Sequence, residues 1–224
     1  MTHLDIELKQ LKEEAIEMFD LVTLQLRKAK SSLLNNDKEL SREINFNEKR
    51  VNALELKIDK DCENIFALFN PLAVDLRFVL AVLKINSNLE RIGDIADGIA
   101  RYVVETPVRF DDDLIGVTRI IEMFNMAISM LEDVRSSFDR EDTKLSRGIF
   151  KKDDFLDEMN AKANAEVEEF IKNHNDKIGQ SLHIISTIRK LERTGDQIKN
   201  VAEEIIFYIE AKVLKHNSGK AKIE

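Results

Sequence analysis

The sequence predicts an all-α protein built as two tandem three-helix bundles, with six long antiparallel helices related by an internal repeat. Three observations support this prediction. The 224 residues include only seven glycines and two prolines, where average usage would be roughly 7% and 5%, so tight turns are few. Apolar residues recur at steps of three and four over long stretches, the spacing of a helix stripe. Finally, one short motif occurs twice.

The repeated motif reads LERIGD at residues 89–94 and LERTGD at residues 191–196, an offset of 102 residues. Upstream the offset becomes 105, which pairs Asp37 with Asp142. Two copies of one unit therefore fill the chain. We predict a first three-helix bundle over residues 1–107, a second over residues 108–214, and a flexible tail over residues 215–224, which contain small and basic residues.

The first repeat contains three apolar stripes with helical spacing. They cover residues 4–33, 44–69 and 78–103. A short polar run separates the first two helices, where a turn and a new N-cap are expected. Asn70-Pro71 ends the second helix because the residue before proline avoids the helical conformation. Pro71 is suited to the first turn of the third helix.

The second repeat follows the same plan, with helices predicted at residues 111–140, 143–173 and 178–214. The connections within each repeat are short. Short connections between long helices favour antiparallel neighbours, so each repeat is expected to be an up-down-up bundle.

Charge and cysteine content exclude several classes of protein. The formal net charge is −8, the wrong sign for a protein that neutralises nucleic-acid phosphates. No apolar run is long enough for a membrane span, and the N-terminus has no signal-peptide pattern. The single cysteine, Cys62, cannot form an intramolecular disulfide. We therefore expect a cytoplasmic protein, with Cys62 as a small buried residue of the second helix.

Two glycines occupy equivalent positions in the middle of predicted helices. Glycine inside a helix costs about 1 kcal/mol relative to alanine, yet Gly93 and Gly195 both lie within the repeated motif. One explanation is close packing of helices. The other is that each glycine keeps room beside neighbouring carboxylates.

Those carboxylates form a pair in each repeat, Glu90 with Asp94 and Glu192 with Asp196. Each pair is spaced i, i+4, so its members are neighbours on one helix face and repel each other unless something neutralises them. The pairs continue stripes that begin with apolar residues, so we expect partial desolvation. They are either a solvated face with nearby arginines or part of a cation site.

The second helix of each repeat brings further oxygen ligands to the same level. Because it folds back on the third helix, Glu48 and Asn52 are expected opposite the first acidic pair, and Asp153 and Asp157 opposite the second. The four histidines fall outside these clusters. Oxygen-only sets suit Mg, Ca, Mn or oxidised Fe more than Zn or Cu. No nucleophile-base set and no phosphate-binding loop is found.

Several segments of the sequence resemble those of a known family. The segments NPLAVDLR (70–77), LKI (83–85), LERIGDIA (89–96) and LERTGD (191–196) are similar to those of the PhoU family of phosphate-signalling regulators. The similarity extends over nearly the whole chain. It implies a cytoplasmic, non-enzymatic, homodimeric helper that dampens phosphate-starvation signalling. Such a helper contacts a sensor histidine kinase and the ATPase of the phosphate ABC transporter, and it meets the membrane only through these partners.

The resemblance also implies a metal. Members of the family bind metal ions or multinuclear clusters through Glu/Asp-x-x-x-Asp motifs, which correspond here to Glu90, Asp94, Glu192 and Asp196. Iron is the first expectation, with Mg, Mn, Ca or Zn as alternatives. Asn52 departs from the pattern because an aspartate is usual at its position.

A second implied site is the Asp-Leu-Arg segment near the start of the third helix. The second repeat has Lys177 and Gly179 in this region instead, so only the first repeat would offer Asp75 and Arg77 to a partner. An aspartate in a first helical turn also favours the helix dipole without any other role.

Two other functional classes stay open from the residues alone. One is a metal-dependent enzyme acting on phosphate compounds, which would need an open metal position and a base. The other is a metal-free helical interaction or chaperone protein.

Overall fold

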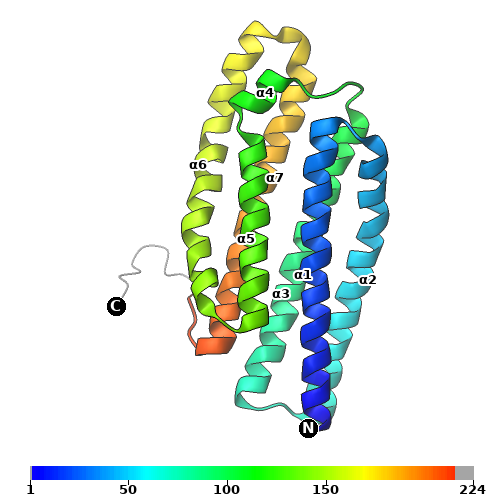
Figure 1. Ribbon diagram of the computed structural model, residues 1–224, viewed down its shortest axis with the longest axis vertical. Coiled ribbons are helices and arrows are strands. Elements are labelled where there is room, and N and C mark those ends of the chain that lie inside the picture. Colours follow the sequence, from blue (N-terminus) through cyan, green and yellow to red (C-terminus); the bar gives the residue numbers. More distant parts are fainter. Residues whose placement is uncertain (1, 215–224) are drawn as a thin grey trace.

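Long helices make up nearly all of the structure, a computed structural model that describes residues 2–214 (Figure 1). The predicted tail, residues 215–224, lies outside the described residues. The all-α fold class and the duplicated plan are confirmed. The elements are α1 (His3–Asn35), α2 (Lys38–Phe69), α3 (Ala73–Glu105), α4 (Asp112–Val117), α5 (Ile120–Arg140), α6 (Thr143–Asn173), the 3-10 turn η1 (Asn175–Lys177) and α7 (Ile178–Glu210).

The turn between the first two long helices of each repeat is built in the same way twice. In the first repeat the Asp37 side chain accepts a hydrogen bond from the backbone N–H of Leu40, which caps α2. The hydroxyls of Ser32 and Ser41 bond to each other across the two helices. The corresponding residues of the second repeat are Ser137, Asp142 and Ser146. The equivalent residues lie 105 positions apart, which is the structural counterpart of the sequence repeat.

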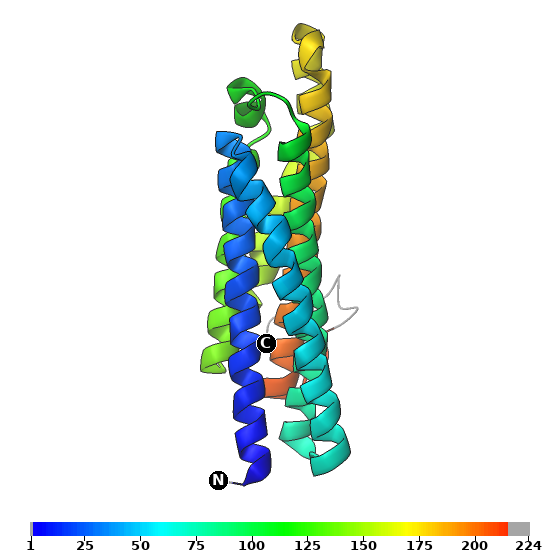
Figure 2. The same ribbon diagram turned by 90° about the vertical axis from the view of Figure 1, so that its right-hand side faces the viewer.

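The two repeats pack antiparallel to each other. The α2–α3 turn lies at one end of the long axis and the α6–α7 turn at the other, in both views (Figures 1 and 2). Within the interface, α3 runs along α7 and α1 runs along α5. Lys84 of α3 pairs with the buried Glu204 of α7 at 3.1 Å, and Arg135 of α5 pairs with Asp20 of α1 at 2.9 Å.

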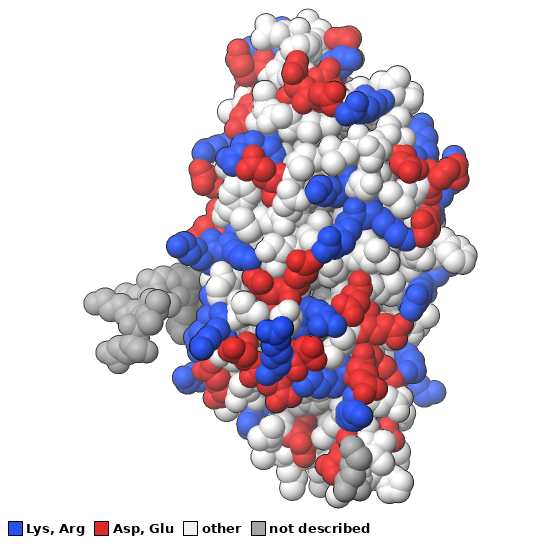
Figure 3. All heavy atoms as spheres, in the orientation of Figure 1, with Lys and Arg blue, Asp and Glu red and all other residues white. Residues whose placement is uncertain are grey.

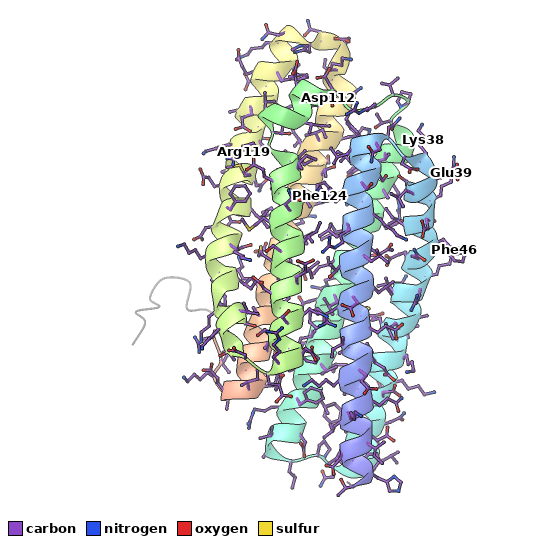
Figure 4. The ribbon with its side chains drawn as sticks, viewed as in Figure 1. Lys38, Glu39, Phe46, Asp112, Arg119 and Phe124 are labelled. Atoms are coloured by element: carbon purple, nitrogen blue, oxygen red, sulfur yellow. The ribbon has the colours of Figure 1, made fainter. Side chains whose placement is uncertain are left out.

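The core is continuous across the two repeats. Part of it is a group of four aromatic rings, one each from α1, α3, α5 and α7. Phe138 contacts all the other three, with ring centroids 5.6, 6.1 and 6.0 Å away. Its neighbours are Phe19 of α1, Phe78 of α3 and Tyr208 of α7. Elsewhere Phe124 is fully buried on α5, whereas Phe46 points away from α2 into solvent (Figure 4).

The predicted single helix at residues 111–140 is wrong, because the structure divides it into α4 and α5. Arg119 adopts a left-handed conformation with φ of 50°, and the Thr118 hydroxyl donates to the Leu114 carbonyl. The backbone therefore turns between the two helices, and Arg119 lies at the start of α5 (Figure 4). The apolar periodicity spans this break and so could not reveal it.

Two predicted helix ends also need correction. The last helix ends at Glu210 and not at residue 214, because Ala211 is left-handed with φ of 55°. Pro71 precedes the first turn of α3, whose N-cap is Leu72. Cys62 is fully buried, as predicted. Among the described residues, no helix is long and apolar enough to cross a membrane.

The surface carries both signs of charge in alternation. On the face that contains α1 and α5, acidic and basic side chains are interspersed (Figure 3). Several of them pair across the interface between the repeats, including Lys12 with Glu141 at 2.6 Å. Such exposed pairs add about 0–1 kcal/mol each to stability, so the core accounts for most of the packing between the repeats.

Candidate functional site

The first acidic cluster lies where α2 crosses the middle of α3. A methyl group placed on Gly93 would lie 3.3 Å from the Glu48 carboxylate and 3.0 Å from Val51. In the second repeat, Gly195 faces Asp153 and Leu156 in the same way. The predicted register between the second and third helices is therefore confirmed. Both explanations for the glycines hold, since each glycine allows close packing and also makes room for a carboxylate.

Glu48 is the most unusual residue of the first cluster. Its side chain is only 7% exposed, and neither carboxylate oxygen has a hydrogen-bond partner among the described residues. Burial, followed by the charges of three nearby carboxylates, raises the pKa of Glu48 to about 7. These neighbours are Asp94, Asp97 and Glu90. The charge of Arg101 opposes this shift, but among the described residues no basic side chain binds Glu48 directly, so its ionised form has no paired counter-ion.

Asp97 completes the first cluster one turn further along α3. It is 1% exposed and accepts hydrogen bonds from Arg101 and from the Asn45 amide at 3.0 Å. Lys190 of α7 also approaches this region, where its ammonium lies beside Gly98. Arg101 and Lys190 thus supply positive charge at the edge of the cluster.

The two acids of the α3 pair differ in burial. Asp94 is exposed, and Glu90 is only partly buried. Burial and the Asp94 charge raise the pKa of Glu90. Asn52 is exposed on α2. The expectation of partial desolvation is therefore confirmed for Glu90 and wrong for Asp94, whose side chain is exposed.

The second cluster contains a lysine that the first one lacks. Asp153 is 3% exposed, and one of its oxygens accepts a hydrogen bond from the Lys199 ammonium. Lys199 also binds Asp196 at 2.9 Å. Burial raises the pKa of Asp153 even though Lys199 opposes the shift. Burial lowers the pKa of Lys199, but its two carboxylate partners outweigh this and raise it above its usual value.

The remaining acids of the second cluster lie at its edge. Glu192 is partly buried and Asp157 is exposed. Burial, and then the charges of Asp196 and Asp157, raise the pKa of Glu192. The predicted set is thus gathered around two buried carboxylates, Glu48 and Asp153, and not around the i, i+4 pairs.

The donor set of the first cluster fits a hard cation. Glu48 offers two buried oxygens without partners, and the neighbouring acids are hydrogen-bond acceptors that repel each other. Within residues 2–214 no three acidic, histidine or cysteine side chains are already close enough to hold a metal ion. The second cluster fits less well, since the Lys199 ammonium already binds Asp153 and Asp196.

The same substitution at the two glycines is expected to have unequal effects. Alanine at Gly195 would overlap the Asp153 carboxylate and lie 2.7 Å from Leu156, so Gly195→Ala should lower the free energy of unfolding by about 1–3 kcal/mol. At Gly93 the contacts are longer, and the gain in helix propensity of about 1 kcal/mol offsets them. Urea denaturation of both variants checks this, and equal losses would contradict it.

The Asp-Leu-Arg segment lies at the end of the molecule where α2 turns into α3. Arg77 donates to the backbone carbonyl of Tyr208, 3.5 Å away, near the C-terminus of α7, so it helps to satisfy the last carbonyls of that helix. Asp75 lies in the first turn of α3 and is partly buried. Around them, Leu68, Leu72 and Val74 are exposed, which makes this turn an apolar tip.

Sequence reasoning did not include Asp97 and Lys199 among the candidate site residues. Both lie one turn beyond the acidic pair, on the same helix face, and they are equivalent positions 102 residues apart. The alignment of the two repeats therefore already pairs these two positions next to the acidic motif. Arg101 and Asn45 could be recognised only after the helices were placed together.

Comparison with known proteins agrees with this architecture. The PhoU domain model matches residues 15–103 and 120–205. The "Phosphate-specific transport system accessory protein PhoU homolog 1" of Thermotoga maritima is 31% identical over 216 residues, which cover 95% of this chain and 91% of that protein. The Escherichia coli "Phosphate-specific transport system accessory protein PhoU" is 29% identical, with 95% of this chain and 88% of that protein covered.

Solved structures show the same similarity. The crystal structure of PhoU from Pseudomonas aeruginosa superposes with a TM-score of 0.85 at 26% identity, and 94% of this chain and all of that chain are covered. The phosphate transport system regulatory protein PhoU from Streptococcus pneumoniae gives a TM-score of 0.82 at 26% identity, with coverage of 95% and 99%. With its duplicated three-helix plan, its glycine-acid motifs and these similarities, the chain belongs to the PhoU family.

Proposed function

We propose that this protein is a regulatory accessory protein of phosphate transport that acts by binding partners and not by catalysis. The observation that carries the proposal is the similarity over almost the entire chain, both repeats included, to proteins named as accessory or regulatory components of the phosphate transport system. The proposed location is the cytoplasm. The proposed partners are a sensor histidine kinase and the ATPase of the phosphate transporter, with a homodimer as the working form.

The apolar tip at the α2–α3 turn supports a docking role for the first repeat. Leu68, Leu72 and Val74 expose large apolar side chains beside Asp75 and Arg77. Exposed apolar residues next to charged ones are typical of protein interaction sites. We place the transporter ATPase on this tip, with Asp75 giving orientation and Arg77 holding the turn against α7.

The first acidic cluster supports a cation-binding role within the same function. Glu48, Glu90, Asp94 and Asp97 would hold the cation, which would supply the positive charge that Glu48 lacks. Iron, Mn, Mg or Ca suit these oxygen donors better than Zn does. When bound, the cation would join α2 to α3 in the middle of the first bundle.

A genetic experiment tests the regulatory role. Deletion of the gene should raise alkaline phosphatase expression in phosphate-rich medium, because negative regulation of starvation signalling is lost. The full-length gene on a plasmid should restore low expression. Unchanged expression in the deletion strain would contradict the proposal, and multiple turnovers of a phosphoester by the purified protein would favour an enzyme instead.

A matched pair of variants tests the docking site. Val74→Asp should weaken binding to the transporter ATPase by at least about tenfold, which corresponds to about 1.4 kcal/mol, because it places a charge in the apolar tip. The fold should persist, since an acid in the first turn of α3 favours the helix dipole. Leu182→Asp is the control. Leu182 lies near the start of α7 and is 58% exposed, which matches the 57% exposure of Val74 near the start of α3. Equal binding by both variants, measured by calorimetry, would exclude the tip.

A further inference from the structure

The two acidic clusters are equivalent in position but differ at one important residue. Glu90 corresponds to Glu192 and Asp94 to Asp196 at an offset of 102 residues. At the same offset, Asp97 corresponds to Lys199. A carboxylate of the first cluster is therefore replaced by an ammonium in the second.

In the first cluster the buried carboxylate of Glu48 is left without a counter-ion. It is more than nine-tenths buried, and both of its oxygens lack hydrogen-bond partners among residues 2–214. Arg101, whose charge acts on Glu48, instead binds Asp97 through a side chain that is itself mostly exposed. A buried ionised carboxylate without a partner is costly, so this cluster holds a negative charge that an added cation would neutralise.

In the second cluster a single ammonium joins two helices. Lys199 of α7 donates to Asp153 of α6 and to Asp196 of its own helix. This is the arrangement that a bridging metal ion would produce, with carboxylates of two helices bound to one positive centre. The equivalent glycine, Gly195, keeps the space that the Asp153 carboxylate needs.

We infer that Lys199 is a built-in counter-ion that takes the place of a divalent cation in the second repeat, so that the chain binds such a cation in its first repeat alone. The inference rests on the proposed cation site of the first cluster. An ammonium group only donates hydrogen bonds and repels other cations. A divalent ion could enter the second cluster only by displacing Lys199 from Asp153.

Counting bound Mn²⁺ on the full-length chain tests the inference. Protein stripped with chelator and titrated with Mn²⁺, with free Mn²⁺ followed by electron paramagnetic resonance, should bind about one equivalent in the wild type. Glu48→Gln should abolish this binding. Asp153→Asn, the matched variant at the equivalent position, should leave it unchanged.

Exchange of the two distinguishing residues gives the sharper result. Lys199→Asp should add a second Mn²⁺, because it restores the residue found at position 97, and Asp97→Lys should remove the first. Lys199→Asn serves as a second variant should the aspartate prevent folding. Lys199→Asn should also lower the melting temperature. Added Mn²⁺ should recover most of that loss, and the same Mn²⁺ with excess chelator should not.

The outcomes separate the two proposals. Two Mn²⁺ per wild-type chain would overturn the role of Lys199 while leaving the first-repeat site in place. No binding by the wild type, together with binding by Lys199→Asp, would remove the first-repeat site and keep the role of Lys199. No binding by either protein, or loss of binding in Asp153→Asn, would overturn the inference.

Discussion

Phe138→Ala is expected to lower the free energy of unfolding by about 3–5 kcal/mol, the usual cost of removing a fully buried aromatic ring. Phe138 is fully buried and contacts the rings of α1, α3 and α7. Its removal therefore opens a cavity where the two repeats meet. The neighbouring rings could move into this cavity only in part, because they belong to different helices, so most of the loss in the free energy of unfolding should remain.

Urea denaturation followed by circular dichroism measures this loss. Phe46→Ala is the control, since Phe46 is an exposed phenylalanine on α2 (Figure 4); it should change the free energy of unfolding by less than about 0.5 kcal/mol. A loss below about 1 kcal/mol for Phe138→Ala would mean that the aromatic rings do not join the repeats as described.

The second large effect is expected from Glu48→Gln in metal-free protein above pH 7. Burial and neighbouring carboxylates raise the pKa of Glu48 to about 7 in the folded protein, whereas an unfolded glutamate titrates near 4.3. Between these values the folded protein keeps a proton that the unfolded chain loses. The carboxyl therefore contributes stability that is fully present below about pH 4 and is lost as the pH rises through 7.

Glutamine carries no charge at any pH, so the variant should be more stable than the wild type by about 3–4 kcal/mol at pH 8. The difference should vanish near pH 4. Denaturation in the presence of chelator across this range measures it. Glu63→Gln, at an exposed position of the same helix, should show little difference at either pH. A constant difference for Glu48→Gln would show that packing, and not ionisation, is responsible.

Most of the fold could be predicted because the long helices carry their own signals. Apolar periodicity located α1, α2 and α3, and the repeated motif revealed the duplication, which in turn placed α6 and α7. The break at Arg119 was not predictable, because a left-handed arginine has no sequence signature comparable to glycine. The end of α7 at Glu210 depends in the same way on the backbone conformation of Ala211.

The sequence predicted which acidic residues lie near each other in the two candidate clusters, but not which of them are buried. The register between helices followed from hairpin geometry, which correctly placed Glu48 and Asp153 beside the glycine motifs. Which carboxylates are buried could not follow from one helix alone, because burial depends on how α2 and α6 cover their neighbours. Asp94 therefore proved exposed and Asp97 buried, although both lie on the acidic side of α3.

The antiparallel packing of the repeats makes the molecule a rod with two distinguishable ends. The α2–α3 turn and the α6–α7 turn point in opposite directions (Figure 2), yet duplication did not keep them alike: one carries Asp75 and Arg77, the other Lys177 and Gly179. A partner that recognises one end leaves the other facing outward. The rod therefore has a direction, and anything attached to it at one end is held at a defined orientation relative to whatever meets the opposite end.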